Sequence, residues 1–283
     1  MEDILRERSH AVLRVLILQV INNASIISNK SEKTLVGIAR RTGSCLAQDA
    51  ISASDRSAAE QIARILATEA IERVRCELSK AIRYSKHLPR DLAMLLAHDV
   101  DSVSCPFLEV TEVFLDSDWK SLVLTIKKST MVAVARRTSM NESLALSLAE
   151  IGDIPVIETL IVNPVTPMGG SVGHVILDRF SSKTQILEKL GKRDDVIADV
   201  VVRMTKIIVA SAREKMAIKY NSSDFSHPLA AEAEAAVILD SLENISLKNL
   251  MPVVINIQCE GDLKPLLVLA ALKMKKLRFV VAA

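Results

Sequence analysis

Three stretches in the first half of the chain share one pattern of apolar and polar residues. Each opens with an apolar residue, continues with polar residues that favour a helix start, and then carries an apolar stripe at helical spacing; the opening residues are Leu88, Leu115 and Met140. Each stretch is followed by a second apolar segment, at residues 103–109, 131–137 and 156–163. A pattern that returns after about 26 residues is typical of stacked helical repeats. We therefore expect helix pairs that bury their stripes against neighbouring pairs.

The same spacing predicts which side chains of the repeats form the core. Leu92, Leu144 and Leu148 lie on the stripes and should be buried, whereas Arg90 and Asn141 should face solvent. These predictions fix the register of the helices.

Polar residues mark the expected helix starts. Residues 139–142 and 182–185 fit the capping box, in which a hydroxyl and a second polar side chain satisfy free N–H groups. Asp153 and Pro155 suit an N-cap and a first turn. Asp91, Asp116 and Asp118 should lie at helix N-termini, where the dipole favours negative charge.

Further helices are predicted outside the repeats, and one segment between them is predicted to be a linker. The helices are expected at residues 2–21, 58–85, 184–190, 194–220, 227–242, 247–259 and 262–273. No segment is a convincing strand, although residues 253–258 are ambiguous. Residues 164–173 are rich in glycine and proline, which favours a flexible boundary. We expect N-terminal helices at 1–55, helical repeats at 56–168, and a smaller C-terminal helical module at 169–283.

Composition supports an all-α fold. Aromatic residues make up only 3% of the chain, and leucine, isoleucine, valine and alanine dominate the apolar 49%. Close-packed helices suit that core better than a β-sandwich does. The fold class that we predict is an all-α, right-handed α-solenoid with a smaller C-terminal helical module. The net charge of +2 lacks the footprint of a general nucleic-acid binder.

No residue set predicts catalysis, a metal or a cofactor. The four cysteines are widely spaced, which favours reduced thiols in the core of a cytoplasmic protein over disulfides or zinc ligands. His98 and Cys105 could approach each other, but a satisfied structural pair is the simpler interpretation. The run that ends at Gly173 lacks the lysine of a phosphate-binding loop. The apolar stretch at residues 11–27 is too polar to span a membrane, and no basic segment precedes it.

Basic doublets are the only candidate binding residues. Basic residues that we expect at helix ends or on polar faces occur at 127–128, 136–137, 192–193 and 273–276. The candidate partner-binding residues among them are Lys127, Lys128, Arg136 and Arg137. Cations are favourable near helix C-termini on electrostatic grounds alone. The alternative is a groove for an acidic partner or a phosphate backbone.

The chain resembles an uncharacterised bacterial family of HEAT-like helical repeats, domain of unknown function 2336. The resemblance covers residues 72–168 and a further block at 250–272, and rests on motifs at 74–78, 88–93, 96–99, 103–108, 116–118, 133–137, 152–153 and 163. It implies an α-solenoid without an assigned activity or catalytic residues. Similar proteins continue beyond the position of Ala283, which would make the last module truncated.

These observations favour a non-catalytic scaffold that binds a protein partner in regulation or signalling. Two alternatives stay open: a nucleic-acid binder that uses the basic doublets, and an enzyme with a site in the divergent C-terminal half. The last seven residues are mostly apolar and lack a polar cap. We therefore expect Phe279 and Val280 either to fold back on the last helix or to mediate self-association.

Overall fold

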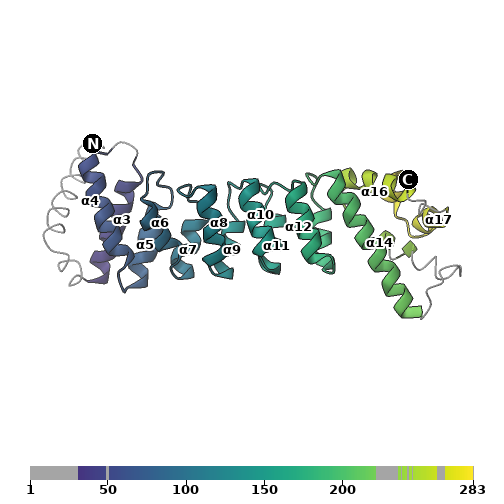
Figure 1. The fold of residues 1–283 in the computed structure, drawn as a ribbon, viewed down its shortest axis with the longest axis horizontal. Helices are drawn as coiled ribbons and strands as arrows, with labels where there is room; N and C mark the ends of the chain where they lie inside the picture. The colour runs from purple at the N-terminus through teal and green to yellow at the C-terminus, as the bar shows by residue number, and fades with distance from the viewer. Residues whose placement is uncertain are drawn as a thin grey trace. The chain divides into compact units, whose positions relative to one another are not determined.

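The structure of the chain is a computed structural model. It describes residues 31–48, 51–220, 235–236, 238–240, 242–243, 245–259 and 265–282. All regular secondary structure in these ranges is helical, as Figure 1 shows, which confirms the predicted all-α class. The chain divides into two compact units, Met1–Val156 (unit 1) and Ile157–Ala283 (unit 2). The helix predicted at residues 2–21 lies outside the described residues.

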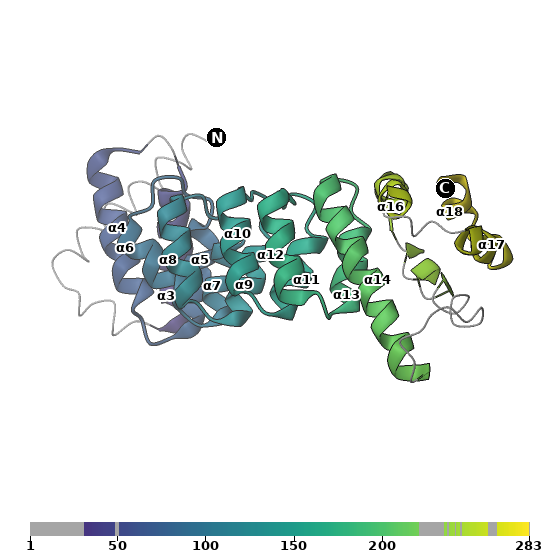
Figure 2. The same ribbon diagram turned by 45° about the vertical axis from the view of Figure 1, so that its right-hand side comes forward.

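Unit 1 is built from successive antiparallel helices. They are α3 (Glu32–Leu46), α4 (Ala53–Ala67), α5 (Glu72–Ile82), α6 (Arg90–Ala97), α7 (Asp101–Leu108), α8 (Asp116–Thr125), α9 (Lys128–Ala135) and α10 (Glu142–Ile151). Helix α11 (Ile154–Val162) runs across the boundary between the units. Helices α3, α5, α7 and α9 pack in sequence against one another, α4 packs on α6, and α8 packs on α10. Figures 1 and 2 show α5, α7 and α9 side by side.

The predicted repeat pairs correspond to α6 with α7, α8 with α9, and α10 with α11. Leu92 and Leu148 are fully buried and Leu144 is 3% exposed, so the predicted core positions are confirmed. Arg90 and Asn141 are exposed, as expected. The apolar stripes therefore set the register of these helices, because each stripe is buried against the neighbouring helices.

Both predicted capping boxes are wrong. Helix α10 begins at Glu142 with Asn141 as its N-cap, and the Asn141 side chain accepts a hydrogen bond from the Leu144 N–H at 2.8 Å. Ser139 instead accepts hydrogen bonds from Arg137. Helix α13 (Thr184–Gly191) follows Lys183, which makes no side-chain cap. In both places the N-cap lies later in the chain than the predicted box placed it, although α13 begins at Thr184, the start predicted for that helix.

Unit 2 contains α12 (Gly170–Phe180), α13, α14 (Ala198–Tyr220), α16 (Leu247–Cys259), α17 (Pro265–Lys273) and α18 (Leu277–Ala282). Helix α14 packs on α12 and α16, and α18 packs on α16 and α17. Residues 253–258, which were ambiguous in sequence, belong to α16. Most of the helix predicted at 227–242 lies outside the described residues, and the described part of its last third is helical.

Residues 164–173 were predicted to be a flexible linker, but the last four of them, 170–173, belong to α12, which begins at Gly170. Gly173 is buried, and a Cβ atom at this position would lie only 2.7 Å from Val200 Cγ2. This glycine therefore permits close packing of α12 on α14. The sequence signal was misread because glycine serves tight helix contacts as well as turns.

Of the C-terminal apolar residues, Phe279 folds back within unit 2, whereas Leu277 and Val281 are exposed. Phe279 on α18 is only 3% exposed. The first of the two predicted alternatives is therefore confirmed for Phe279. Self-association stays a prediction.

Candidate partner-binding surface

The predicted basic residues do not form one cluster. Lys127 is the N-cap of α9 and Arg136 is its C-cap, so the two doublets lie at opposite ends of an eight-residue helix. At a rise of about 1.5 Å per residue, the helix separates them by roughly 12 Å. Arg136 has the favourable position at a helix C-terminus, whereas Lys127 and Lys128 stand at the N-terminus, where a cation is disfavoured.

Arg137 corrects the expectation of a surface charge, because it is only 3% exposed. Its Nη1 donates to the Leu108 carbonyl oxygen at 2.6 Å, and its guanidinium lies over the Trp119 ring, 4.7 Å from the centroid. Burial lowers the pKa of Arg137 to about 10, which leaves it charged at neutral pH. Its geometry serves to cap the last turn of α7. Arg137 therefore leaves the set of candidate partner-binding residues.

Arg193 has the same role in unit 2; the sequence marked it only as part of the basic doublet at 192–193 and did not reveal this role. Its Nη1 donates to the carbonyl oxygens of Ile161 at 2.8 Å and Asn163 at 2.7 Å, at the end of α11. Its Nη2 donates to the Thr166 carbonyl oxygen at 2.9 Å. The available signal was an arginine placed directly after the second helix of a pair, as at Arg137.

The three remaining cations differ in their contacts. Lys128 Nζ donates to the Ile151 carbonyl oxygen at 3.2 Å, and Arg136 Nη1 lies 4.0 Å from Glu109 Oε1. Lys127 is exposed and makes no hydrogen bond or ion pair with its side chain among the described residues. Leu124, in the last turn of α8, is 69% exposed. We call Leu124, Lys127 and Lys128 the α9-start surface; it combines an exposed apolar side chain with two positive charges.

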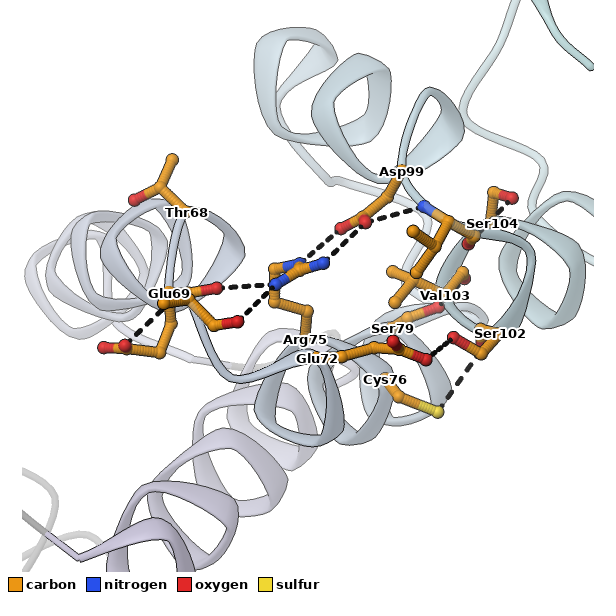
Figure 3. Close-up of polar contacts among 12 residues, drawn as sticks. Thr68, Glu69, Glu72, Arg75, Cys76, Ser79, Asp99, Ser102, Val103 and Ser104 are labelled. Atoms are coloured by element: carbon orange, nitrogen blue, oxygen red, sulfur yellow. Dashed lines mark hydrogen bonds and ion pairs between the residues drawn. The ribbon is translucent and has the colours of Figure 1, made fainter.

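A polar network joins the turn that precedes α5 to the turn that precedes α7 (Figure 3). Arg75 Nε and Nη2 donate to the two carboxylate oxygens of Asp99 at 2.7 and 2.9 Å. Arg75 Nη1 also donates to the Glu69 carbonyl oxygen at 2.7 Å. Ser102 Oγ donates to Glu72 in the same region. The bidentate pair fixes both side chains and links α5 to the start of α7. We call such a contact between two helices a joint.

Charge and burial act against each other at this joint. Burial by itself raises the pKa of Asp99, but the hydrogen bonds from Arg75 and from the Val100 N–H outweigh it and hold this pKa below its usual range. The bond to Asp99 is the main reason that the pKa of Arg75 is raised. Both groups are therefore stabilised in their charged forms.

His98 and Cys105 were considered above as a possible reactive pair, but the ring nitrogens of His98 contact other residues. His98 is exposed, and its ring nitrogens contact the Met94 carbonyl oxygen at 3.0 Å and Thr125 Oγ1 at 2.9 Å. Burial raises the pKa of Cys105. A nucleophilic thiol has a lowered pKa, so this environment is the opposite of an activated one.

Unit 2 places one histidine in a polar cluster on α12 and α14. His174 Nε2 lies 2.8 Å from Asp199 Oδ2, and Arg203 Nη1 lies 3.2 Å from His174 Nδ1. Because arginine only donates, Nδ1 accepts and the ring proton is on Nε2, where it is donated to Asp199. Arg203 also pairs with Asp178. The cluster ties two helices together, and sequence reasoning did not find it because the partners are 25 residues or more apart.

The part of the chain that the structure describes contains no group of three or more histidine, cysteine, aspartate or glutamate side chains that could hold a metal ion. Among the same residues, no helix is both long enough and apolar enough to cross a membrane.

Over the residues that the structure describes, the fold is thus all-helical, and side chains join successive helices. The chain belongs to a family described as uncharacterised protein conserved in bacteria (DUF2336), whose model matches residues 103–283. This confirms the domain of unknown function suggested by the sequence motifs, whereas the HEAT-like description of its repeats stays a prediction. No curated protein and no solved structure matches the chain.

Proposed function

We propose that the helix pairs of unit 1 form a right-handed, HEAT-like α-solenoid that acts as a non-catalytic scaffold. In this proposal the scaffold binds an acidic protein partner in a regulatory or signalling role, and the α9-start surface is part of the contact. The proposal is supported by the order of packing from α3 to α9, in which each helix contacts its near neighbours in sequence.

One observation carries the proposal: charged and polar side chains near the helix ends of unit 1 are used to join helices. Arg64 Nε donates to Asp91 at 2.6 Å, Arg90 pairs with the buried Asp118, and Asn141 Nδ2 donates to Asp116 at 2.6 Å. These contacts link α4 to α6, α6 to α8, and α8 to α10.

The α9-start surface differs from these joints. Lys127 makes no such contact among the described residues, and Leu124 remains exposed beside it. An exposed apolar side chain next to unpaired positive charge suits an acidic partner with an apolar contact residue.

The test is capture of a partner from the native host by the full chain, compared between two charge-matched variants. Lys127→Glu with Lys128→Glu reverses the α9-start surface. Lys33→Glu with Lys86→Glu reverses two exposed lysines elsewhere in unit 1. We expect the first variant to lose at least about tenfold in affinity for the captured protein and the second to lose little.

Two outcomes would contradict the proposal. Equal capture by both variants would remove the α9-start surface from the contact. Capture that disappears after nuclease treatment, with affinity that falls steeply as salt is raised, would instead favour the nucleic-acid alternative.

A further inference from the structure

Unit 2 contains a cavity of about 180 Å³ that no function discussed so far uses. It lies between the segment that precedes α16 and the start of α18. Its apolar wall consists of buried side chains, each 2 to 3% exposed: Leu239, Leu242, Leu250 and Phe279. These nearly buried side chains give the cavity an apolar lining.

The mouth of the cavity is positively charged. Lys275 and Arg278 line it, and both are exposed. Arg278 donates to the carbonyl oxygens of Glu243 and Ile245, and within the described ranges neither Lys275 nor Arg278 has a carboxylate partner. Lys276 and Glu243 also line the cavity, but they pair with each other, and Lys276 lies 3.2 Å from Asp240 as well. Two positive charges at the mouth are thus left uncompensated by an ion pair.

The backbone holds one of these cations in an uncommon conformation. Lys275 has a φ of 56°, in the left-handed region that glycine and asparagine adopt more easily than lysine. Glycine or asparagine would adopt this backbone conformation more easily. Lys275 therefore makes the turn between α17 and α18 less stable than either residue would.

The size of the cavity limits its occupant. A protein cavity of about 150 Å³ can hold one benzene molecule, whereas sites for larger ligands have volumes of about 300–1,000 Å³. The cavity in unit 2 therefore has room for one branched or aromatic group and not for a nucleotide or a comparable cofactor.

We propose that this cavity binds a small carboxylate that carries one apolar group. The apolar group enters between the leucines and Phe279, and the carboxylate faces Lys275 and Arg278 at the mouth. A free carboxylic acid and the C-terminal residue of a peptide both have this chemistry. The site requires no residue of α9, so it is independent of the scaffold function proposed above.

The first experiment uses the full chain and ligand-detected saturation-transfer NMR. The main probe is N-acetyl-leucine, which has both the carboxylate and the branched apolar group. We expect a dissociation constant on the order of 1 mM, since a ligand of this size gains only a fraction of a kcal/mol per atom. N-acetyl-leucinamide lacks the charge and N-acetyl-serine lacks the apolar group, and each should bind at least about fivefold more weakly.

Two more probes distinguish the sources of the ligand. Isocaproate is a free acid with the same branched group, and N-acetyl-Gly-Gly-Leu presents it at a peptide C-terminus. Tighter binding of the tripeptide identifies a peptide end as the ligand, whereas equal or tighter binding of isocaproate identifies free acids.

Matched variants locate the binding at the cavity. Lys275→Asn removes the charge in a residue type that tolerates the left-handed backbone, and Leu277→Glu adds a negative charge at a lining residue that is 66% exposed. Each should weaken N-acetyl-leucine about threefold or more. Lys248→Asn, an exposed site of unit 2 outside the cavity lining, is the control and should leave binding unchanged.

The proposal is overturned if N-acetyl-leucine shows no saturation transfer at about 20 mM, well above the expected dissociation constant. It is also overturned if the amide binds as well as the acid, or if both cavity variants bind like the native chain. The comparison of acid with amide uses the native chain and does not depend on how a variant folds.

Discussion

Neighbouring helices of unit 1 and the helices α13 and α16 of unit 2 are held together by different kinds of hydrogen bond. In unit 1, several contacts between helices pair two side chains across one repeat, as in Arg75–Asp99 and Arg64–Asp91. In unit 2, Asn249 on α16 donates from Nδ2 to the carbonyl oxygens of Arg193 at 2.5 Å and Gly191 at 3.4 Å. The first kind of joint needs two matched residue types, whereas the second needs only one side chain and a nearby backbone.

This difference decides what can be detected in a sequence. A side-chain pair that returns with the repeat leaves charged residues at related positions. A side chain that bonds to a backbone carbonyl leaves no sign of its partner, because every residue has that carbonyl. The α13–α16 contact also joins residues that are 56 and 58 positions apart, far outside any local pattern.

The largest effect is expected from breaking the Arg75–Asp99 joint with Asp99→Asn. The two side chains are only 16% and 11% exposed, and loss of one partner of a buried pair typically costs 3–5 kcal/mol. Because water still reaches this pair, we expect a smaller loss of about 2–3 kcal/mol in the free energy of unfolding at neutral pH. Asp101→Asn, at an exposed position two residues away, should cost less than about 1 kcal/mol.

The pH dependence sharpens this test. The pKa of Asp99 is lowered in the folded chain, so its contribution is fully present above the pKa of about 3.9 of a free aspartate. The contribution is lost as the pH falls through the lower folded value. The stability difference between the native chain and Asp99→Asn, measured by urea unfolding, should therefore shrink below about pH 4. A difference that stays constant from neutral to acid pH would show that the charge of Asp99 is not what joins the helices.

A smaller effect is expected at the corresponding joint of unit 2. Asn249 is 2% exposed, and Asn249→Ala leaves two carbonyl oxygens without this donor. We expect a loss of about 1–2 kcal/mol, with faster amide hydrogen exchange in α13 and α16. Asn256→Ala on the same helix is the matched control, because Asn256 is only partly buried. Equal effects of the two variants would mean that the Asn249 hydrogen bonds do not hold α16 in place.

The parts of the fold that follow a period were predictable, and those that rest on single contacts were not. The stripes placed Leu92 and Leu148 in the core because burial of apolar surface dominates folding energetics. Gly173 was misread because its close neighbour, Val200, belongs to another helix. Arg137 was expected at the surface because a sequence does not reveal that Trp119 and the end of α7 enclose its guanidinium. The sequence identified the basic residues of the candidate site, but it did not show that the two doublets lie at opposite ends of α9.

The smallest effect concerns the start of α10, where sequence and structure assign the N-cap to different residues. The sequence pattern favours Ser139, whereas in the structure Asn141 accepts from the Leu144 N–H and donates to Asp116. Loss of an N-cap typically costs about 0.5–2 kcal/mol, so we expect Asn141→Ala to lower the free energy of unfolding by about 1 kcal/mol. Ser139→Ala should stay within about 0.5 kcal/mol, because its exposed hydroxyl only accepts from Arg137. If urea unfolding ranks the two variants in the opposite order, α10 begins where the sequence pattern placed it.

A double variant of Asn141→Ala with Asp116→Ala adds a further comparison. If the Asn141–Asp116 hydrogen bond joins α8 to α10, the two substitutions should be non-additive, since either one removes the same contact.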